Sequence, residues 1–413
     1  MAMTEGIRID DLAAPRFAPE VAEVLAAMGA VAGDCALDAA ALHERAVRET
    51  GLVDFGPRDY AERLDVLLAA LREVPGVTPA GVVGFHAQLL QLLKNRLLLT
   101  DLLARHPEVA EVELAPPIVI AGLPRTGTTH LHNLLAAGPG LRTLPYWESL
   151  EPFPLAAEAG VEPDPRRERT ELAVSFMNAA MPLFPLMHEM TTDHVHEEIQ
   201  LLAVDFSTMF FETLAHVPSW EAYYRAHDQR PHYRYLRTML GALQFLRGGR
   251  RWLLKSPQHL EQLPVVADVF PGATVVVTHR DPVAVVVSLA TMISYTARMH
   301  RSPVDPAVLG RAWADRVGAM LEACRRDRDV LAPERSLDVR FDEFMADDLA
   351  TARRVLDVAG EPAGPEVEAA MAGYLDGHRR GRLGRIAYRA ADVGLDEDEL
   401  RVRYAAYRER FLA

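Results

Sequence analysis

The size, composition and charge of the chain exclude several broad classes of protein. With 413 residues, of which 49% are hydrophobic and 25% charged, the chain has the composition of a globular protein with a large core. Its formal net charge of −14 argues against binding to nucleic acid or to an anionic membrane, because both need a basic surface. A local basic pocket stays compatible with this charge.

Targeting signals and cysteine chemistry are equally sparse. The first residues lack a basic segment followed by an apolar one, and no uninterrupted apolar run approaches the roughly 20 residues of a membrane helix. We therefore expect a cytoplasmic protein with no membrane partner. Cys35 and Cys324 are the two cysteines, and their distance in the sequence supports neither a disulfide framework nor a cysteine-based zinc site.

Residues 1–115 are predicted to be helical. One helix opens at Asp59 and continues through an apolar stripe until Pro75 and Gly76 stop it. A second begins at Pro79, a residue suited to a first helical turn, and extends through a dense leucine stripe to Leu98. Such a stripe is typical of a core or of a dimer contact, so a homodimer stays open.

The segment from Ile118 to Leu135 predicts a strand, a phosphate loop and a helix. Backbone N–H groups in such a loop, and at the start of its helix, favour an anion. The spacing Gly122-x-x-x-x-Gly127 matches the first part of a nucleotide-binding P-loop. Thr128, however, stands where that loop has the lysine that reaches the β- and γ-phosphates, so we do not expect a triphosphate.

Arg125 lies inside this loop, and the hydroxyls of Thr128 and Thr129 follow the glycine. The pattern Arg-Thr-Gly-Thr-Thr after a strand resembles the 5′-phosphosulfate loop of sulfotransferases that use 3′-phosphoadenosine-5′-phosphosulfate (PAPS). The resemblance implies that Arg125, Thr126, Gly127, Thr128 and Thr129 hold the donor and that Arg125 stabilises charge during transfer. The alternative is an ordinary Gly/Thr turn between a strand and a helix.

A second block, from Arg251 to Ser288, predicts strand, helix, strand and helix. The valine run before Thr278 is typical of a strand covered on both faces. Asp281 suits an N-cap and Pro282 the first helical position, which leaves Arg280 at the carboxyl end of the strand.

This block also carries the resemblance. Sulfotransferases grip the 3′-phosphate of PAPS with an arginine at a strand end and a serine eight positions later, and Arg280 with Ser288 fits that spacing. Lys255 resembles a lysine that faces the nucleotide in the bacterial branch. Alternatively, Arg280 pairs with a neighbouring carboxylate and Ser288 is a buried helix hydroxyl.

Three later segments complete the pattern. Residues 337–341 predict another strand after a helix near 308–326, and residues 396–411 predict a final helix that opens at Asp396. The basic, glycine-containing segment 378–385 resembles the loop that closes over the 3′-phosphate and adenine, which implies that Arg380 and Gly381 contact the donor. Such Arg-Gly clusters also occur as ordinary solvated loops.

The general base is the least determined group. Glu148 follows the first βα unit, where ligands collect in an open parallel sheet, and the resemblance implies an acidic base near this position; it could equally be a solvated or capping carboxylate. A helix predicted from Asp193 to Phe210 places His196 and Glu198 beside its apolar face and Glu197 away from it. His188 is a weaker candidate.

Together these features predict an α/β protein with a parallel central sheet flanked by helices, a three-layer architecture like that of P-loop NTPases. We expect a helical region at 1–115 and a sulfotransferase domain at 116–413, with a helical insertion at about 150–235. The expected activity is sulfuryl transfer from PAPS to a hydroxyl or amine of a small apolar or aromatic acceptor, without a metal because protein cations replace it. The alternatives are a P-loop kinase or NTPase and a non-catalytic nucleotide-binding scaffold.

Overall fold

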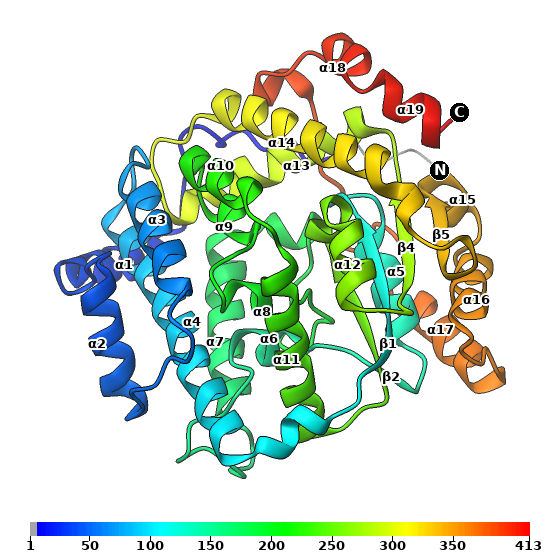
Figure 1. Ribbon diagram of the computed structural model, residues 1–413. Coiled ribbons are helices and arrows are strands. Elements are labelled where there is room, and N and C mark those ends of the chain that lie inside the picture. Colours follow the sequence, from blue (N-terminus) through cyan, green and yellow to red (C-terminus); the bar gives the residue numbers. More distant parts are fainter. Residues whose placement is uncertain (1–5) are drawn as a thin grey trace.

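A computed structural model describes residues 6–413 and shows an α/β architecture (Figure 1). Five parallel strands form one sheet in the order β2-β3-β1-β4-β5. Their bounds are β1 Ala115–Gly122, β2 Leu141–Arg142, β3 Arg251–Ser256, β4 Thr274–His279 and β5 Ser336–Arg340. Four of these strands confirm the sequence prediction. Strand β2 was missed because two residues are too short to show a pattern.

The sheet register brings the predicted site to one edge. Every residue of β3 and β4 is buried, as expected for strands covered on both faces. Ala121 pairs with Ser256, and Gly122 pairs with Thr278, so β1, β3 and β4 end at the same level. The loop after β1, Lys255 and Arg280 therefore all lie at the carboxyl edge of the sheet, where ligands of open α/β folds bind.

Helices cover both faces of the sheet because alternate strand residues face opposite sides. Ile118 and Ile120 pack with helices α5 Thr128–Ala136, α16 Asp348–Ala359 and α17 Pro365–Gly377. Val119 and Ala121 belong to a larger core with α11, α12, α13 and α14. These four helices span Arg230–Arg247, Leu263–Val269, Pro282–Thr296 and Pro306–Asp327. The three-layer prediction is confirmed.

The N-terminal region is helical, as predicted, and lies at the side of the molecule away from β5 (Figure 1). Its helices are α1 Pro19–Ala30, α2 Ala39–Thr50, α3 Tyr60–Arg72 and α4 Pro79–Arg105. The leucine stripe of α4 is buried in the same hydrophobic core as Val119 of the sheet. These helices and the sheet thus share one core, while the boundary near residue 115 stays a prediction.

The insertion consists of short helices joined by extended segments. Its helices are α6 Tyr146–Leu150, α7 Pro165–Ala180, α8 Ile199–Ala203, α9 Phe210–Leu214 and α10 Pro218–Ala226. The prediction of one helix from Asp193 to Phe210 is wrong, because the span before Ile199 is not helical and α8 covers only Ile199–Ala203. Tyr146 N donates to His194 O at 2.9 Å and His196 N donates to Leu144 O at 2.7 Å, so this segment is extended against the start of α6. Phe206, with a φ of 51°, separates α8 from α9.

The helix termini follow the predicted capping. Asp281 caps α13 by accepting from Val283 N at 3.0 Å, and Pro282 is the first helical residue. The predicted C-terminal helix is broken at Tyr404 into α18 Glu397–Arg403 and α19 Ala405–Phe411, with Asp396 as its N-cap. The window Pro282–Met299 is long and apolar enough to cross a membrane by composition, but 78% of it is buried inside the protein.

A buried carboxylate ties the N-terminal helices to the rest of the chain. Asp205 accepts from Arg63 of α3 at 2.9 Å and from Arg96 of α4 at 2.8 Å, and lies 2.6 Å from His232 Nδ1 of α11. Burial alone would raise the pKa of Asp205, but the hydrogen bond from His232 and the two arginines outweigh it and lower the pKa. Asp205 is therefore ionised and paired at neutral pH.

Asp205→Asn should cost about 3–5 kcal/mol of unfolding free energy, because it leaves the buried guanidinium of Arg96 without an anion and removes the buried partner of Arg63. Asp59→Asn is the matched control, since Asp59 pairs with the same Arg63 at 3.0 Å but is 60% exposed. We expect it to cost about 1 kcal/mol or less. Urea unfolding measures both variants. Equal losses of unfolding free energy would contradict the role of Asp205 as the buried ion-pair partner that joins these helices.

Candidate active site

The loop between β1 and α5 is fixed by close packing. Thr126 Oγ1 lies 2.6 Å from Thr278 Oγ1 and donates to Leu123 O, and both threonines are buried. A Cβ at Gly122 would lie 2.0 Å from Thr278 Oγ1, so this position requires glycine. Arg125 and Gly127 adopt left-handed backbone conformations, with φ of 72° and 89°. The loop then enters α5, whose first N–H groups have no partner within the helix.

A polar cavity of about 560 Å³ opens above this loop. Its basic lining side chains are those of Arg125, Arg280, Arg379, Arg380 and Arg382. Two of these arginines are neutralised by carboxylates, because Arg380 pairs with Asp348 and Arg382 donates to Glu189 at 2.6 Å. Even so, this acidic protein concentrates positive charge here, as a site for an anion requires.

Arg280 lies just past β4 and faces this cavity. Its guanidinium stacks over the Phe341 ring at 4.0 Å and donates to Arg125 O at 2.7 Å. Among residues 6–413 no carboxylate lies within ion-pair distance of Arg280, so the alternative of a structural ion pair is not supported. Burial and the charge of Arg125 lower the pKa of Arg280. A bound anion would oppose this effect, because it stabilises the charged guanidinium.

The other predicted donor contacts lie around the same loop. Ser288 accepts from Arg125 Nε at 3.0 Å and lines an adjoining cavity of about 340 Å³ that both Arg125 and Arg280 also line. Lys255 is buried, and its Nζ donates to Thr129 Oγ1 at 3.3 Å and pairs with Glu197. Gly381 lines the polar cavity beside Arg380.

A second, apolar cavity of about 430 Å³ lies on the other side of the loop. Its lining includes the methionines Met177, Met181, Met190, Met209, Met292 and Met299. Arg125, Thr128, Thr129 and His188 line both this cavity and the polar one. The two cavities therefore meet at the loop, where a group bound in one can reach a group bound in the other.

Neutral histidines surround this junction. Burial, the imidazole of His194 and the positive charges of Lys255 and Arg125 hold the pKa of His188 well below its ordinary value. Burial, the charge of Lys255 and the imidazoles of His194, His188 and His132 do the same for His196, which lines the apolar cavity. Both imidazoles are uncharged at neutral pH and can accept a proton. Within the described residues, no cluster of three or more His, Cys, Asp or Glu side chains could hold a metal ion.

Residues 116–365, more than half of the chain, match a family model described as "Sulfotransferase family". The chain belongs to the sulfotransferase family. It is 26% identical over 259 residues to the omega-hydroxy-beta-dihydromenaquinone-9 sulfotransferases Stf3 of Mycobacterium bovis and Mycobacterium tuberculosis. That match covers 61% of this chain and 65% of the relatives, just under two thirds of their length.

Two crystal structures of mycobacterial sulfotransferases share the fold over nearly the whole chain. STF1 from Mycobacterium tuberculosis H37Rv has a TM-score of 0.79 and 29% identity, with 90% of this chain and 99% of that one covered. STF9 from Mycobacterium avium has a TM-score of 0.81 and 26% identity, with 91% and 97% covered. The expected resemblance to bacterial sulfotransferases is confirmed.

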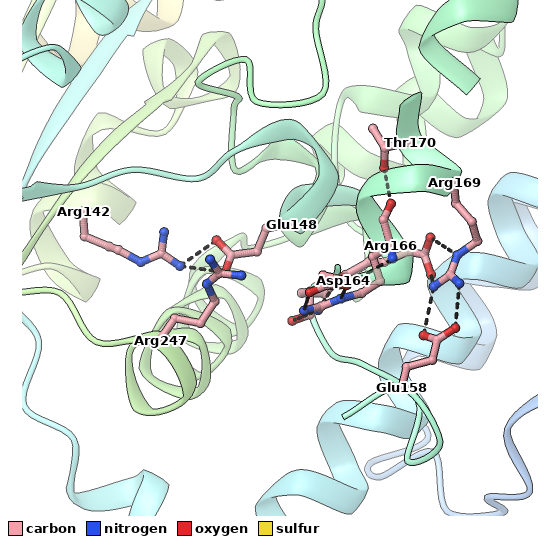
Figure 2. A network of polar contacts seen from close by, with 10 residues as sticks. Arg142, Glu148, Glu158, Asp164, Arg166, Arg169, Thr170 and Arg247 are labelled. Atoms are coloured by element: carbon pink, nitrogen blue, oxygen red, sulfur yellow. Dashed lines mark hydrogen bonds and ion pairs between the residues drawn. The ribbon is translucent and has the colours of Figure 1, made fainter. Parts of the chain in front are cut away.

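Glu148 of this sulfotransferase lies in an ion-pair network (Figure 2). It lines neither cavity. It is fully buried, accepts two hydrogen bonds from Arg142 at 2.6 and 2.8 Å, and lies 3.3 Å from Arg247. The guanidinium of Arg247 also stacks on Trp147 at 4.6 Å. These contacts orient Glu148 toward the scaffold rather than toward a ligand in either cavity.

Glu198 is likewise enclosed. It is 1% exposed, accepts from Lys255 N at 2.9 Å and pairs with His259, and it lines neither cavity. Glu197, which the helical pattern placed away from the apolar face, lines the apolar cavity instead. Residues 193–198 are not helical, so positions on a helical wheel do not apply to them. No local pattern from Val195 to Glu198 indicates this, because one apolar residue is followed by three polar ones.

Glu198→Gln should lower the unfolding free energy by about 1–3 kcal/mol at pH 7, because it removes a buried carboxylate that contacts His259 and accepts from Lys255 N. Burial opposes ionisation, but His259 and the hydrogen bond from Lys255 N lower the pKa of Glu198 below its unfolded value. Its contribution is therefore complete above about pH 4.3 and lost as pH falls through the folded pKa. Unfolding curves across this range should converge for the variant and the unmodified protein; a constant difference would contradict this pairing.

Proposed function

We propose that this sulfotransferase transfers a sulfuryl group from PAPS to a hydroxyl of a small apolar acceptor. The observation that supports it is the meeting of an arginine-rich cavity and a methionine-rich cavity at Arg125, Thr128, Thr129 and His188. The first cavity suits an anionic nucleotide and the second an uncharged molecule. Transfer between the two requires such a junction.

The residues of the polar cavity fit the phosphate groups of PAPS. The N–H groups at the start of α5, with the hydroxyls of Thr128 and Thr129, would hold the 5′-phosphosulfate. Arg280 would form bidentate hydrogen bonds to the 3′-phosphate, and the Ser288 hydroxyl would donate to the same phosphate from the adjoining cavity. Arg380 and Gly381 would cover the nucleotide from segment 378–385, whose backbone reaches the cavity.

Catalysis in this scheme rests on positioning and charge. PAPS supplies an activated sulfuryl group, and by analogy with phosphoryl transfer its movement needs alignment and stabilisation of developing charge. Arg125 contributes a guanidinium at the junction, held by Ser288 and by the carbonyl oxygen of Met187. Lys255, through Thr129, adds a second positive charge beside the loop.

His188 is the proton acceptor that we assign, because it lines both cavities and is neutral. Glu197 is the second candidate: it lines the acceptor side and pairs with Lys255. His196 lines the same cavity, whereas Glu148 and Glu198 are engaged elsewhere.

Two alternative functions lose support. A kinase or NTPase would need a lysine where Thr128 stands, and the family match favours a sulfotransferase. A non-catalytic scaffold has no use for a neutral base between the two cavities. The cytoplasmic location and a homodimer stay predictions from the sequence.

One assay tests the proposal against both alternatives. The protein is incubated with PAPS and a panel of aliphatic alcohols and phenols, and 3′,5′-ADP is measured with and without Arg125→Ala. We expect acceptor-dependent release of 3′,5′-ADP that the substitution abolishes. Binding of 3′,5′-ADP without turnover on any acceptor would favour the scaffold. Stabilisation by ATP with Mg²⁺ but not by 3′,5′-ADP would overturn the proposal.

Arg280→Ala should weaken binding of 3′,5′-ADP by about 2–5 kcal/mol, because a buried charge-assisted pair with phosphate is lost. Arg280→Lys should recover part of the affinity, since it keeps the charge but not the bidentate fork. Arg234→Ala, an exposed arginine of α11, serves as the control and should change nothing. Titration calorimetry measures all three; unchanged affinity in Arg280→Ala would remove Arg280 from the nucleotide site.

His188→Gln should lower kcat by roughly 10²–10⁴-fold while leaving the affinity for 3′,5′-ADP unchanged. Because the pKa of His188 is depressed, its neutral form persists below pH 6.5, so the acid limb of kcat/KM in the unmodified enzyme should lie well below that pH. Glu197→Gln and Glu148→Gln are assayed in parallel. Loss of activity in Glu197→Gln with His188→Gln still active would transfer the role of base to Glu197.

A further inference from the structure

The apolar cavity follows one face of α13. Leu289, Met292, Ile293 and Thr296 line it at helical spacing, and Met299 and His300 continue the lining past the end of the helix. Ser288, which accepts from Arg125, lies at the loop end of this face. His300 lies twelve positions further along the chain, a rise of about 18 Å at helical spacing. The cavity is therefore elongated, with the loop at one end and His300 at the other.

The two ends of this cavity are polar and its middle is apolar. At the far end, the ring of His300 stacks on Phe85 of α4 at 4.7 Å with an interplanar angle of 2°. Gln88, one turn further along α4, and Trp313 of α14 line the same cavity. The charged lining residues, Arg125 and Glu197, both belong to the loop end, because Arg125 bonds Ser288 and Glu197 pairs with Lys255.

The His300 imidazole has unused hydrogen-bonding capacity. Its Nδ1 is buried and has no partner among the described residues, whereas Nε2 lies on the edge of the ring that faces Gly84 of α4. Burial lowers the pKa of His300 to about 4, so the ring is neutral at pH 7 and offers one N–H and one acceptor nitrogen. Nε2 likewise has no hydrogen-bond partner among the described residues and is not enclosed, so it is the nitrogen that a ligand oxygen in the cavity can meet.

We propose that the acceptor is an elongated, uncharged alcohol with a second hydrogen-bonding oxygen at the end opposite the sulfated hydroxyl, and that His300 binds this oxygen. The inference rests on the proposed sulfuryl transfer for the identity of the reacting end. Binding of the second oxygen by His300 does not depend on the proposed sulfuryl transfer. A carboxylate at that end would find no cation beside it, because Arg125 lies at the loop end of the lining, which is why the second group is a hydroxyl or a carbonyl.

The test compares 1-alkanols with α,ω-alkanediols of the same chain length, from octane to hexadecane derivatives. Binding is measured by titration calorimetry without any donor. We expect diols of intermediate length to bind roughly 3- to 10-fold more tightly than the matching alkanols, the value of one hydrogen bond. Shorter diols should lose this preference, because they cannot span the cavity.

His300→Phe keeps the aromatic stack on Phe85 and removes both nitrogens. It should abolish the preference for diols while alkanol affinity stays the same or improves. His216→Phe is the matched control, because His216 lies outside the apolar cavity, and it should retain the preference. Circular dichroism and the unfolding midpoint verify that both variants fold.

Three results would overturn the inference: no binding of either series, equal affinities at every chain length, or a diol preference that survives His300→Phe. The same compounds are then offered with PAPS. Diols that bind in a His300-dependent way but release no 3′,5′-ADP would support the His300 site and count against the proposed sulfuryl transfer. Turnover of alkanols and diols with equal kcat/KM would support the transfer and count against the His300 site.

Discussion

The contact between Gly122 and Thr278 is the constraint on which the site depends. The hydroxyls of Thr126 and Thr278 form a hydrogen bond at 2.6 Å, and a side chain at position 122 would collide with Thr278. This contact locks the loop onto β4 and sets Arg125, in a left-handed conformation, between the two cavities. A loop displaced by one ångström would misalign groups on both sides, and such displacements reduce rates severely.

The distribution of carboxylates explains how an acidic chain keeps a basic cleft. Asp205, Glu148 and Glu198 are all buried, and each is held by arginine, histidine or backbone groups of the scaffold. These three carboxylates join helices and strands, and none of them lines the polar cavity. Arg280 is left with aromatic and backbone contacts instead of a carboxylate, and so stays available to an anion.

Local sequence signals were sufficient for the fold and insufficient for the base. The valine run of β4, the N-cap Asp281 and the glycine loop each act over a few residues, so their patterns predicted the strands, the start of α13 and the anion loop. The segment around His196 depends on hydrogen bonds to Leu144 and Tyr146, some fifty residues away, and its helical prediction failed. The burial of Glu148 likewise depends on Arg247, which is distant in the sequence.

The contact of His300 with α4 joins the apolar cavity to the N-terminal helical region. Thr78 N donates to His300 O at 2.9 Å, and Gly81 lets the two backbones approach closely. Phe85 and Gln88 of α4 lie outside residues 116–365, the span that matches the family model, yet Gln88 lines the apolar cavity and Phe85 supports His300. Changes in α4 can therefore alter which molecule is accepted without disturbing the loop between β1 and α5.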